Sequence, residues 1–170
     1  GVPLDAIRQP NEEGLRRGLA NLDRHVENLR GFGQSVVVVF NLFADDTPEE
    51  MELLRHHCEE ELGVPFAINR SYAQGGSGAE EMARVLVDTV ENHPSEPQLR
   101  FTYADDDPLR EKIEKVARTI YRAGSVNYSA AAAKTLAELT EMGYGDLPVC
   151  IAKTQYSFSD NAKLTGAPEG

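Results

Sequence analysis

The stretch Ser35-Val36-Val37-Val38-Val39-Phe40 decides the fold class of this 170-residue chain. Its unbroken run of β-branched residues predicts a strand buried on both faces, as in a parallel sheet covered by helices. On both sides of it, apolar residues recur at helical spacing between glycine, proline and capping residues. These patterns predict helices over about 11–30, 47–62, 77–90, 107–121 and 129–143, and strands over about 35–40, 64–69, 125–128 and 147–153.

The alternation of strands and helices predicts βαβ units. We therefore expect an α/β fold in which a mostly parallel, Rossmann-like sheet is flanked by helices. The segment 91–100 contains two prolines and few apolar residues, which favours a domain boundary there. We expect a Rossmann-like domain over residues 1–95 and a smaller, truncated C-terminal α/β subdomain over residues 96–170.

Local signals predict where several helices begin and end. Thr47–Glu50 has the pattern of a capping box with proline at the first helical position, and Ser77–Glu80 has a second such pattern. Gly63 is placed to end the second helix, since glycine tolerates the left-handed conformation found there. Ser129 is placed to cap the fifth helix.

The composition argues against several classes of partner. The net charge of −11 repels phosphate backbones and anionic lipids, so neither nucleic acid nor a membrane is expected as a partner. Cys58 and Cys150 each lie in an apolar pattern, which indicates reduced, buried thiols in a cytoplasmic protein. The first residues carry no signal peptide and no initiator methionine, and residues 165–170 resemble a loop, so we expect an excised piece of a longer protein.

Three sequence features invite a metal or phosphate interpretation and do not support it. His57 and Glu61 can share a helix face, but two ligands do not make a metal site, and no metal is expected. Asp105–Asp107 is interpreted as helix capping ahead of Pro108. Gly75–Gly78 lies at a helix start, yet no lysine follows, so it is not a phosphate-binding loop of the Walker type.

Two loops are the candidates for ligand binding. In open parallel sheets, ligands bind beyond the carboxyl ends of the strands. Here those positions are Asn41–Asp46 and Arg70–Gly76, which follow consecutive strands and should lie side by side. Phe43 and Tyr72 lie in these loops, where the sheet core does not need an aromatic ring. From position alone, packing beneath the loops and contact with a ligand are equally favoured.

Several segments carry a resemblance to a known family. They are Gly1–Leu4, Gly18–Leu22, His25–Asn28, Val38–Thr47, Gly75–Gly78, Gly143–Pro148, Ala152–Ser157, Ser159–Asp160 and Lys163–Leu164. In these segments the chain resembles formate–tetrahydrofolate ligase, also called formyltetrahydrofolate synthetase. The matches follow the family's order along nearly the whole chain, which makes chance similarity implausible.

The resemblance implies an ATP-dependent ligase of one-carbon metabolism that forms 10-formyltetrahydrofolate from formate and tetrahydrofolate through formyl phosphate. It places this piece in the C-terminal half of the enzyme. The ATP phosphate loop and the residues that hold formyl phosphate would then lie in the missing N-terminal half. ATP and tetrahydrofolate would be substrates of the full enzyme, a cytoplasmic homo-oligomer. The piece alone would bind neither tightly, carry no catalytic residue and be inactive.

The resemblance also implies a site for the flat folate ring. In the family an aromatic pair on two adjacent loops holds a heterocycle, and Phe43 and Tyr72 fall at those positions, with tyrosine where the family usually has tryptophan. We expect the two rings to lie about 7 to 12 Å apart, with room for one inserted ring. The expected folate-binding residues are Phe43, Tyr72, Asn41, Asp46, Gly75 and Gly76.

One further motif has two interpretations. Lys153, Thr154 and Gln155 are rich in donors and acceptors, and they either fix the C-terminal subdomain through hydrogen bonds or contact a ligand of the missing half. For the chain as a whole, the alternative to the ligase is a non-catalytic nucleotide-binding or interaction module of Rossmann type.

Overall fold

The computed structural model of the protein describes residues 9–152, 158–161, 163–164 and 166–168. The chain divides into two compact units, Gly1–Leu99 and Arg100–Gly170, and each is described here by itself. The sequence places this boundary between residues 95 and 96. None of the helices in the described ranges has the length and apolar character needed to cross a bilayer.

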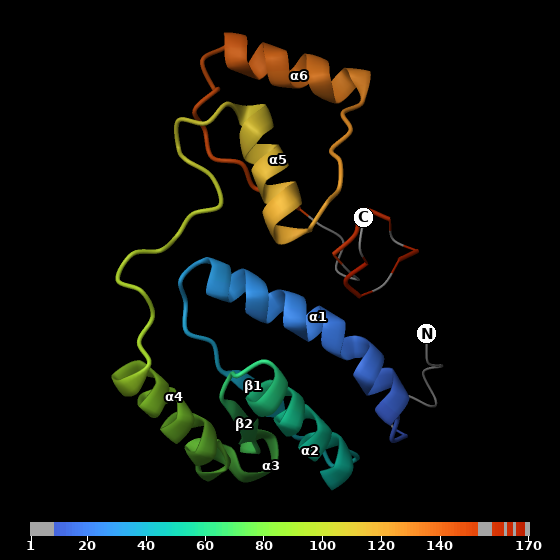
Figure 1. Ribbon diagram of the computed structural model, residues 1–170, viewed down its shortest axis with the longest axis vertical. Helices are drawn as coiled ribbons and strands as arrows, with labels where there is room; N and C mark the ends of the chain where they lie inside the picture. Colours follow the sequence, from blue (N-terminus) through green and yellow to red (C-terminus); the bar gives the residue numbers. More distant parts are fainter. Residues whose placement is uncertain (1–8, 153–157, 162, 165, 169–170) are drawn as a thin grey trace. The chain divides into compact units, whose positions relative to one another are not determined.

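The first unit contains two strands and most of the helices (Figure 1). Its elements are α1 (Glu12–Gly31), β1 (Val38–Asn41), α2 (Pro48–His56), the π-helical η1 (His57–Glu61), β2 (Phe66–Asn69), α3 (Ser71–Gln74), the 3-10 helix η2 (Gly75–Ala79) and α4 (Glu80–Asn92). The second unit contains α5 (Leu109–Ile120) and α6 (Ala130–Glu141).

The sheet is a single parallel pair. β1 and β2 pair from Val38 opposite Phe66 to Asn41 opposite Asn69. The crossover through α2 and η1 joins them, as expected for a βαβ unit. The mixture of helices with a parallel sheet agrees with the predicted α/β class. The larger Rossmann-like sheet is not present in the described residues, where the sheet has two strands.

The strands predicted in the second unit are wrong over the residues that the structure describes. Neither 125–128 nor 147–152 forms a strand, while residue 153 lies outside the described ranges. At Val149, a side chain occupies the backbone groups that strand pairing would need. The Tyr103 hydroxyl accepts from the Val149 amide at 2.9 Å and donates to the Val149 carbonyl at 3.1 Å. One side chain therefore satisfies the two backbone groups that a neighbouring strand would take.

The region 125–128 is held by a side chain as well. The Tyr128 ring lies against the Arg110 guanidinium at 4.3 Å, and its hydroxyl donates to the Arg110 carbonyl at 3.3 Å. This anchors the segment to α5 instead of to a sheet. In the described part of the second unit, the regular elements are α5 and α6, with a single bridge residue at Gly166. The α/β character of the C-terminal subdomain stays a prediction.

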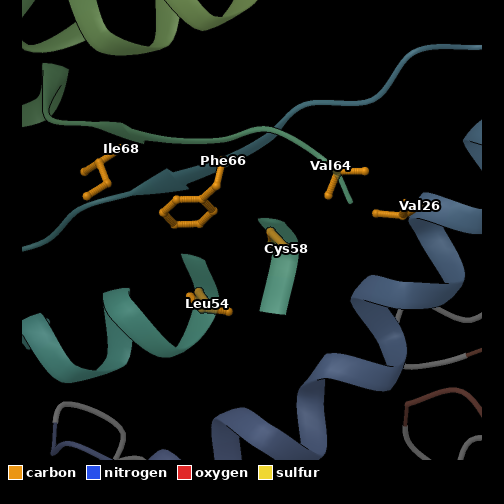
Figure 2. Packing of buried hydrophobic residues seen from close by; sticks show 6 residues of the cluster. All are labelled: Val26, Leu54, Cys58, Val64, Phe66 and Ile68. Atoms are coloured by element: carbon orange, nitrogen blue, oxygen red, sulfur yellow. The ribbon is translucent and has the colours of Figure 1, made fainter. Parts of the chain in front are cut away.

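The core of the first unit lies between the sheet and its helices. Its buried members are Val26, Leu54, Cys58, Val64, Phe66 and Ile68. Figure 2 shows Phe66 of β2 above Leu54 of α2 and close to Cys58, with Val26 of α1 near Val64. Burial, with the nearby charges of Asp23 and Glu59, raises the pKa of the Cys58 thiol to about 11. Cys58 is therefore an unreactive packing residue at neutral pH.

Cys150 corrects the prediction that both thiols are buried. Its side chain is exposed. The prediction assumed a core strand at this position, and no such strand forms there.

The predicted helix ends are mostly confirmed. Thr47 and Glu50 form the reciprocal capping box with Pro48 in the first turn. Gly63 has a φ of +59° after η1, and Ser129 accepts from the Ala132 amide at 3.1 Å. These ends depend on neighbours three or four residues away, which is why the local pattern predicts them.

Two other capping predictions are wrong. The Ser77 hydroxyl donates to the Gln74 carbonyl at 2.9 Å, and α4 begins after Ala79 with no side-chain cap. Ser77 lies inside η2, so no helix begins at this residue. Asp107 accepts from the Ala104 amide and from Lys115 and does not cap α5, whose N-cap position is Pro108.

A buried histidine ties α1 to η1. The His57 ring contacts Asp23 of α1 at 2.6 Å and Glu61 at 3.0 Å. Burial alone lowers the pKa of His57, but the hydrogen bonds and charges of Asp23 and Glu61 outweigh it, and the pKa is raised above its usual value. An imidazolium between two carboxylates therefore stabilises this helix contact.

We expect the stabilisation from His57 to depend on pH. Because its pKa is raised on folding, its contribution is complete below the unfolded value of about 6.5 and is lost as the pH rises through the folded pKa. At pH 6, His57→Gln should lower the free energy of unfolding by about 2 kcal/mol, since charge-assisted hydrogen bonds are removed. Urea unfolding of both proteins from pH 6 upward should show this difference shrinking.

The neighbouring exposed His56 provides the control. His56→Gln should change stability little, by the same amount at each pH. A constant penalty for His57→Gln from pH 6 to 9 would show that the His57 charge does not contribute.

Candidate functional site

The candidate site lies where β1 and β2 end. The Leu42 amide donates to the Asn69 carbonyl at 3.0 Å, so the ladder continues one step past β1. The loop 42–47 then leaves β1, while α3 begins directly after β2 at Ser71. Because the strands are parallel, both segments leave from the same edge of the sheet.

Phe43 and Tyr72 lie together at this edge. Their ring centroids are 5.8 Å apart with an angle of 50° between the ring planes. Phe43 is 56% exposed and Tyr72 is 86% exposed. The prediction that the rings share one edge of the sheet and remain accessible is confirmed, and the alternative that they pack beneath the loops is wrong.

The expected gap between the rings is wrong in this structure. A separation of about 7 to 12 Å was expected, with room for an inserted ring. At 5.8 Å and a tilted angle, the rings instead contact each other. The physical reason is that two exposed aromatic faces reduce their contact with water by packing against each other.

Asp46 shapes the turn that carries Phe43. Its carboxylate accepts from the Phe43 amide at 2.7 Å, and its own amide donates to the Phe43 carbonyl at 3.2 Å. The backbone bond closes a β-turn over residues 43–46, and the side-chain bond holds its first residue from the other side. Asp46 therefore orients the backbone beneath the ring of Phe43.

Asn41 connects the two loops. Its side-chain oxygen accepts from the Asn69 side-chain amide at 2.9 Å, and the Asn69 side-chain oxygen accepts from the Ser71 amide at 3.1 Å. This relay runs from the end of β1 to the first residue of α3, one position before Tyr72. The relay therefore links the end of β1 to the start of α3 next to the two aromatic residues.

The glycines after Tyr72 have different functions. Gly75 has a φ of +59° and ends α3, a conformation that favours glycine. At Gly76 an added Cβ would meet no atom within 4 Å. At Gly78 it would lie 2.5 Å from the carbonyl carbon and oxygen of Arg70, so only glycine fits. Gly78 also accepts from the Arg70 amide at 2.9 Å, which closes the loop that carries Tyr72.

A charged cluster that the sequence analysis missed supports the same loop. Glu81 accepts from the Arg70 guanidinium at 2.9 Å and from the Ile68 amide at 3.1 Å, and it lies 3.5 Å from Arg55. Burial raises the pKa of Glu81, but the hydrogen bonds from Arg70 and Ile68 and the charges of Arg70 and Arg55 outweigh it, so the pKa is lowered. In the sequence, the indication of this cluster was Arg70, a charged residue placed directly after a core strand.

The remaining predicted site residues fall elsewhere. Lys153, Thr154 and Gln155 lie outside the described residues. Within the described ranges, no group of three or more histidine, cysteine, aspartate or glutamate side chains is arranged to hold a metal ion. His57 and Glu61 do contact each other, but as the ion pair described above.

The chain is similar to proteins of one family over its whole length. Residues 1–170 match the family model described as formate–tetrahydrofolate ligase. Proteins with the same name share 57% identity with it over 98% of this chain in Bacteroides thetaiotaomicron, 50% over 100% in Porphyromonas gingivalis and 48% over 100% in Hyphomonas neptunium. The chain spans 30% of the length of these relatives. It belongs to the formate–tetrahydrofolate ligase family.

Proposed function

We propose that this chain is the part of a formate–tetrahydrofolate ligase that holds the flat ring of the folate substrate. The full enzyme would use ATP to form 10-formyltetrahydrofolate from formate and tetrahydrofolate through formyl phosphate. Family membership supports the reaction class. The observation that carries the ring-binding function is the exposed aromatic pair, Phe43 and Tyr72, at the carboxyl ends of two parallel strands.

The contact between the rings is the closed form of a clamp. A ring inserted between two aromatic faces needs those faces about 7 Å apart, so the pair must open for a ligand to enter. Tyr72 is the more exposed ring and lies on the short helix α3, so it is the ring that moves. Insertion replaces one contact between Phe43 and Tyr72 with two contacts to the ligand. Each stack contributes on the order of 1 kcal/mol beyond the area that it buries.

The polar residues around the clamp are placed to form hydrogen bonds with the edge of an inserted ring. Asn41 uses its side-chain oxygen for Asn69, which leaves its amide group to donate to the ligand. Asp46 holds the turn under Phe43, and its carboxylate lies at the same edge. The open space beside Gly75 and Gly76 gives a ligand access to the backbone.

The rest of the reaction is assigned to other parts of the enzyme. The groups that hold the ATP phosphates and formyl phosphate would lie in the missing N-terminal half. This chain would contribute ring stacking through its domain 1–95 and no phosphoryl transfer. Lys153, Thr154 and Gln155 would either fix the C-terminal subdomain or contact a ligand of that half. The full enzyme would be a cytoplasmic homo-oligomer.

Phe43→Ala should weaken tetrahydrofolate binding by about fivefold or more, since loss of one stacking face removes on the order of 1 kcal/mol. Phe43 is 56% exposed, so the fold should remain intact. Isothermal titration calorimetry with tetrahydrofolate measures the affinity, and circular dichroism checks the fold. Tyr72→Trp should strengthen binding, because the larger ring covers more of the ligand.

Phe101→Ala is the matched control, because Phe101 is a 79% exposed phenylalanine in the other unit. It should leave tetrahydrofolate binding unchanged. Equal affinity for wild type and Phe43→Ala would refute the clamp. A thermal shift with nucleotides but not with tetrahydrofolate would favour the nucleotide-binding module instead.

A further inference from the structure

Two asparagine side chains meet at the ends of the strands, beside the aromatic pair. Asn41 and Asn69 are the last residues of β1 and β2, and they lie opposite each other in the parallel register. The Asn69 amide group donates to the Asn41 side-chain oxygen at 2.9 Å. Asn41 closely precedes Phe43 in the chain, and Asn69 closely precedes Tyr72. The pair therefore lies where both ring-bearing segments begin.

The backbone decides which end of each asparagine faces the other. The Ser71 amide donates to the Asn69 side-chain oxygen at 3.1 Å, and a backbone N–H can only donate. The oxygen of Asn69 must therefore face Ser71, which turns its amide group to Asn41. Asn41 must in turn offer its oxygen, because its own amide group would place two donors against each other. The amide group of Asn41 is thus the end that Asn69 does not use.

Asparagine at position 69 does more than hold the start of α3. Aspartate accepts from a backbone amide two residues further on just as asparagine does, so holding Ser71 does not by itself require a side-chain amide. What the amide adds is a fixed orientation for Asn41. An asparagine that is not held can rotate its side-chain amide by half a turn and offer either a donor or an acceptor to a ligand.

We propose that Asn69 is a positioning residue that makes the folate site select a ring with a hydrogen-bond acceptor at the edge facing Asn41. This inference rests on the proposed ring-binding function. Asn41 then meets the ligand with a donor, and a donor of the ligand at the same place would oppose it. The pterin ring of tetrahydrofolate fits, because the carbonyl oxygen at ring position 4 is its one exocyclic acceptor. An analogue with an amino group at that position presents a donor instead.

Asn69→Asp tests the proposal, because it should reverse the orientation of Asn41. The aspartate has nearly the same shape and still accepts from Ser71. Its second oxygen faces Asn41 and needs a donor, so Asn41 turns its amide group inward and its oxygen toward the ligand. The unsubstituted chain should bind tetrahydrofolate about tenfold more tightly than its 4-amino analogue, and Asn69→Asp should prefer the analogue by about fivefold. Isothermal titration calorimetry at a pH at which both rings are uncharged measures the two affinities.

Gln74→Glu is the matched control for the added charge. Gln74 is the exposed last residue of α3, and this substitution makes the same change from amide to carboxylate without touching the two asparagines. It should keep the preference of the unsubstituted chain. Asn69→Ala should bring the two affinities close together, because Asn41 is then able to rotate. A preference for tetrahydrofolate that persists in Asn69→Asp, or an equal reversal in Gln74→Glu, would overturn the proposal.

Nuclear magnetic resonance keeps the test decisive if Asn69→Asp does not fold. In the unsubstituted chain, the side-chain amide signals of Asn41 should shift when tetrahydrofolate is added, because that group donates to the ligand. Signals of Asn41 that stay unchanged at saturation would contradict the proposal.

Failure of the proposed function has a different outcome. The unsubstituted chain would then bind neither ring, or it would bind tetrahydrofolate as tightly as Phe43→Ala does. If Phe43→Ala weakens binding while Asn69→Asp leaves the preference between the two rings unchanged, the ring-binding function holds and the selection through Asn69 is wrong.

Discussion

Lys112→Met should destabilise the second unit by about 3 kcal/mol or more, the largest effect that we expect from a single side chain. The Lys112 side chain is fully buried. Its ammonium group donates to the carbonyl oxygens of Asp105 at 2.6 Å, Asp146 at 3.0 Å and Leu147 at 3.2 Å. Methionine keeps the length of the side chain but leaves these three oxygens without their donor.

The contacts of Lys112 explain why the loss should be large. They join α5 to the turn before it and to the segment after α6, which have no strand pairing to hold them. A charge-assisted hydrogen bond to a buried group contributes roughly twice as much as a neutral one. Urea unfolding followed by the circular dichroism of the helices measures the loss.

Lys115→Met on the same helix is the control. Lys115 is partly exposed and pairs with Asp107 and Glu111 at the surface. Exposed ion pairs contribute little to stability, so the Lys115 variant should unfold close to wild type. Similar unfolding midpoints for the two variants would show that the carbonyl contacts of Lys112 do not hold this unit together.

Gly78→Ala should destabilise the first unit by about 2 kcal/mol and weaken tetrahydrofolate binding as well. The added Cβ would lie 2.5 Å from the carbonyl group of Arg70, and a backbone group cannot rotate away as a side chain would. Overpacking of this kind costs about 1–3 kcal/mol. Because Arg70 directly precedes α3, any relief of the clash moves the helix that carries Tyr72.

Gly76→Ala separates this effect from a general loss of flexibility. An alanine Cβ at position 76 would meet no atom within 4 Å, and Gly76 does not have a positive φ. It should leave the unfolding midpoint and the ligand affinity near those of wild type. Crystal structures of both variants would test the cause, since only Gly78→Ala should shift Ser71–Ala79.

The family, the first strand and several helix ends follow from the sequence alone. The Val38–Thr47 segment carries both the resemblance and the strand β1, and family membership is confirmed over the whole chain. The capping box of Thr47 and the left-handed Gly63 are confirmed because each depends on neighbours within one helical turn. That Phe43 and Tyr72 share an edge follows from parallel topology and needs no knowledge of contacts.

The tertiary structure alone decided which apolar segments pair as strands and how the site is closed. Residues 147–152 are as apolar as a strand, yet the Tyr103 hydroxyl, 46 residues from Val149, takes the backbone groups that a neighbouring strand would bond. The contact of Phe43 with Tyr72, the glycine required at position 78 and the burial of Lys112 likewise join residues far apart or in different loops. Local patterns record the preferences of a few adjacent residues, whereas these features depend on partners that only folding brings within hydrogen-bonding or van der Waals distance.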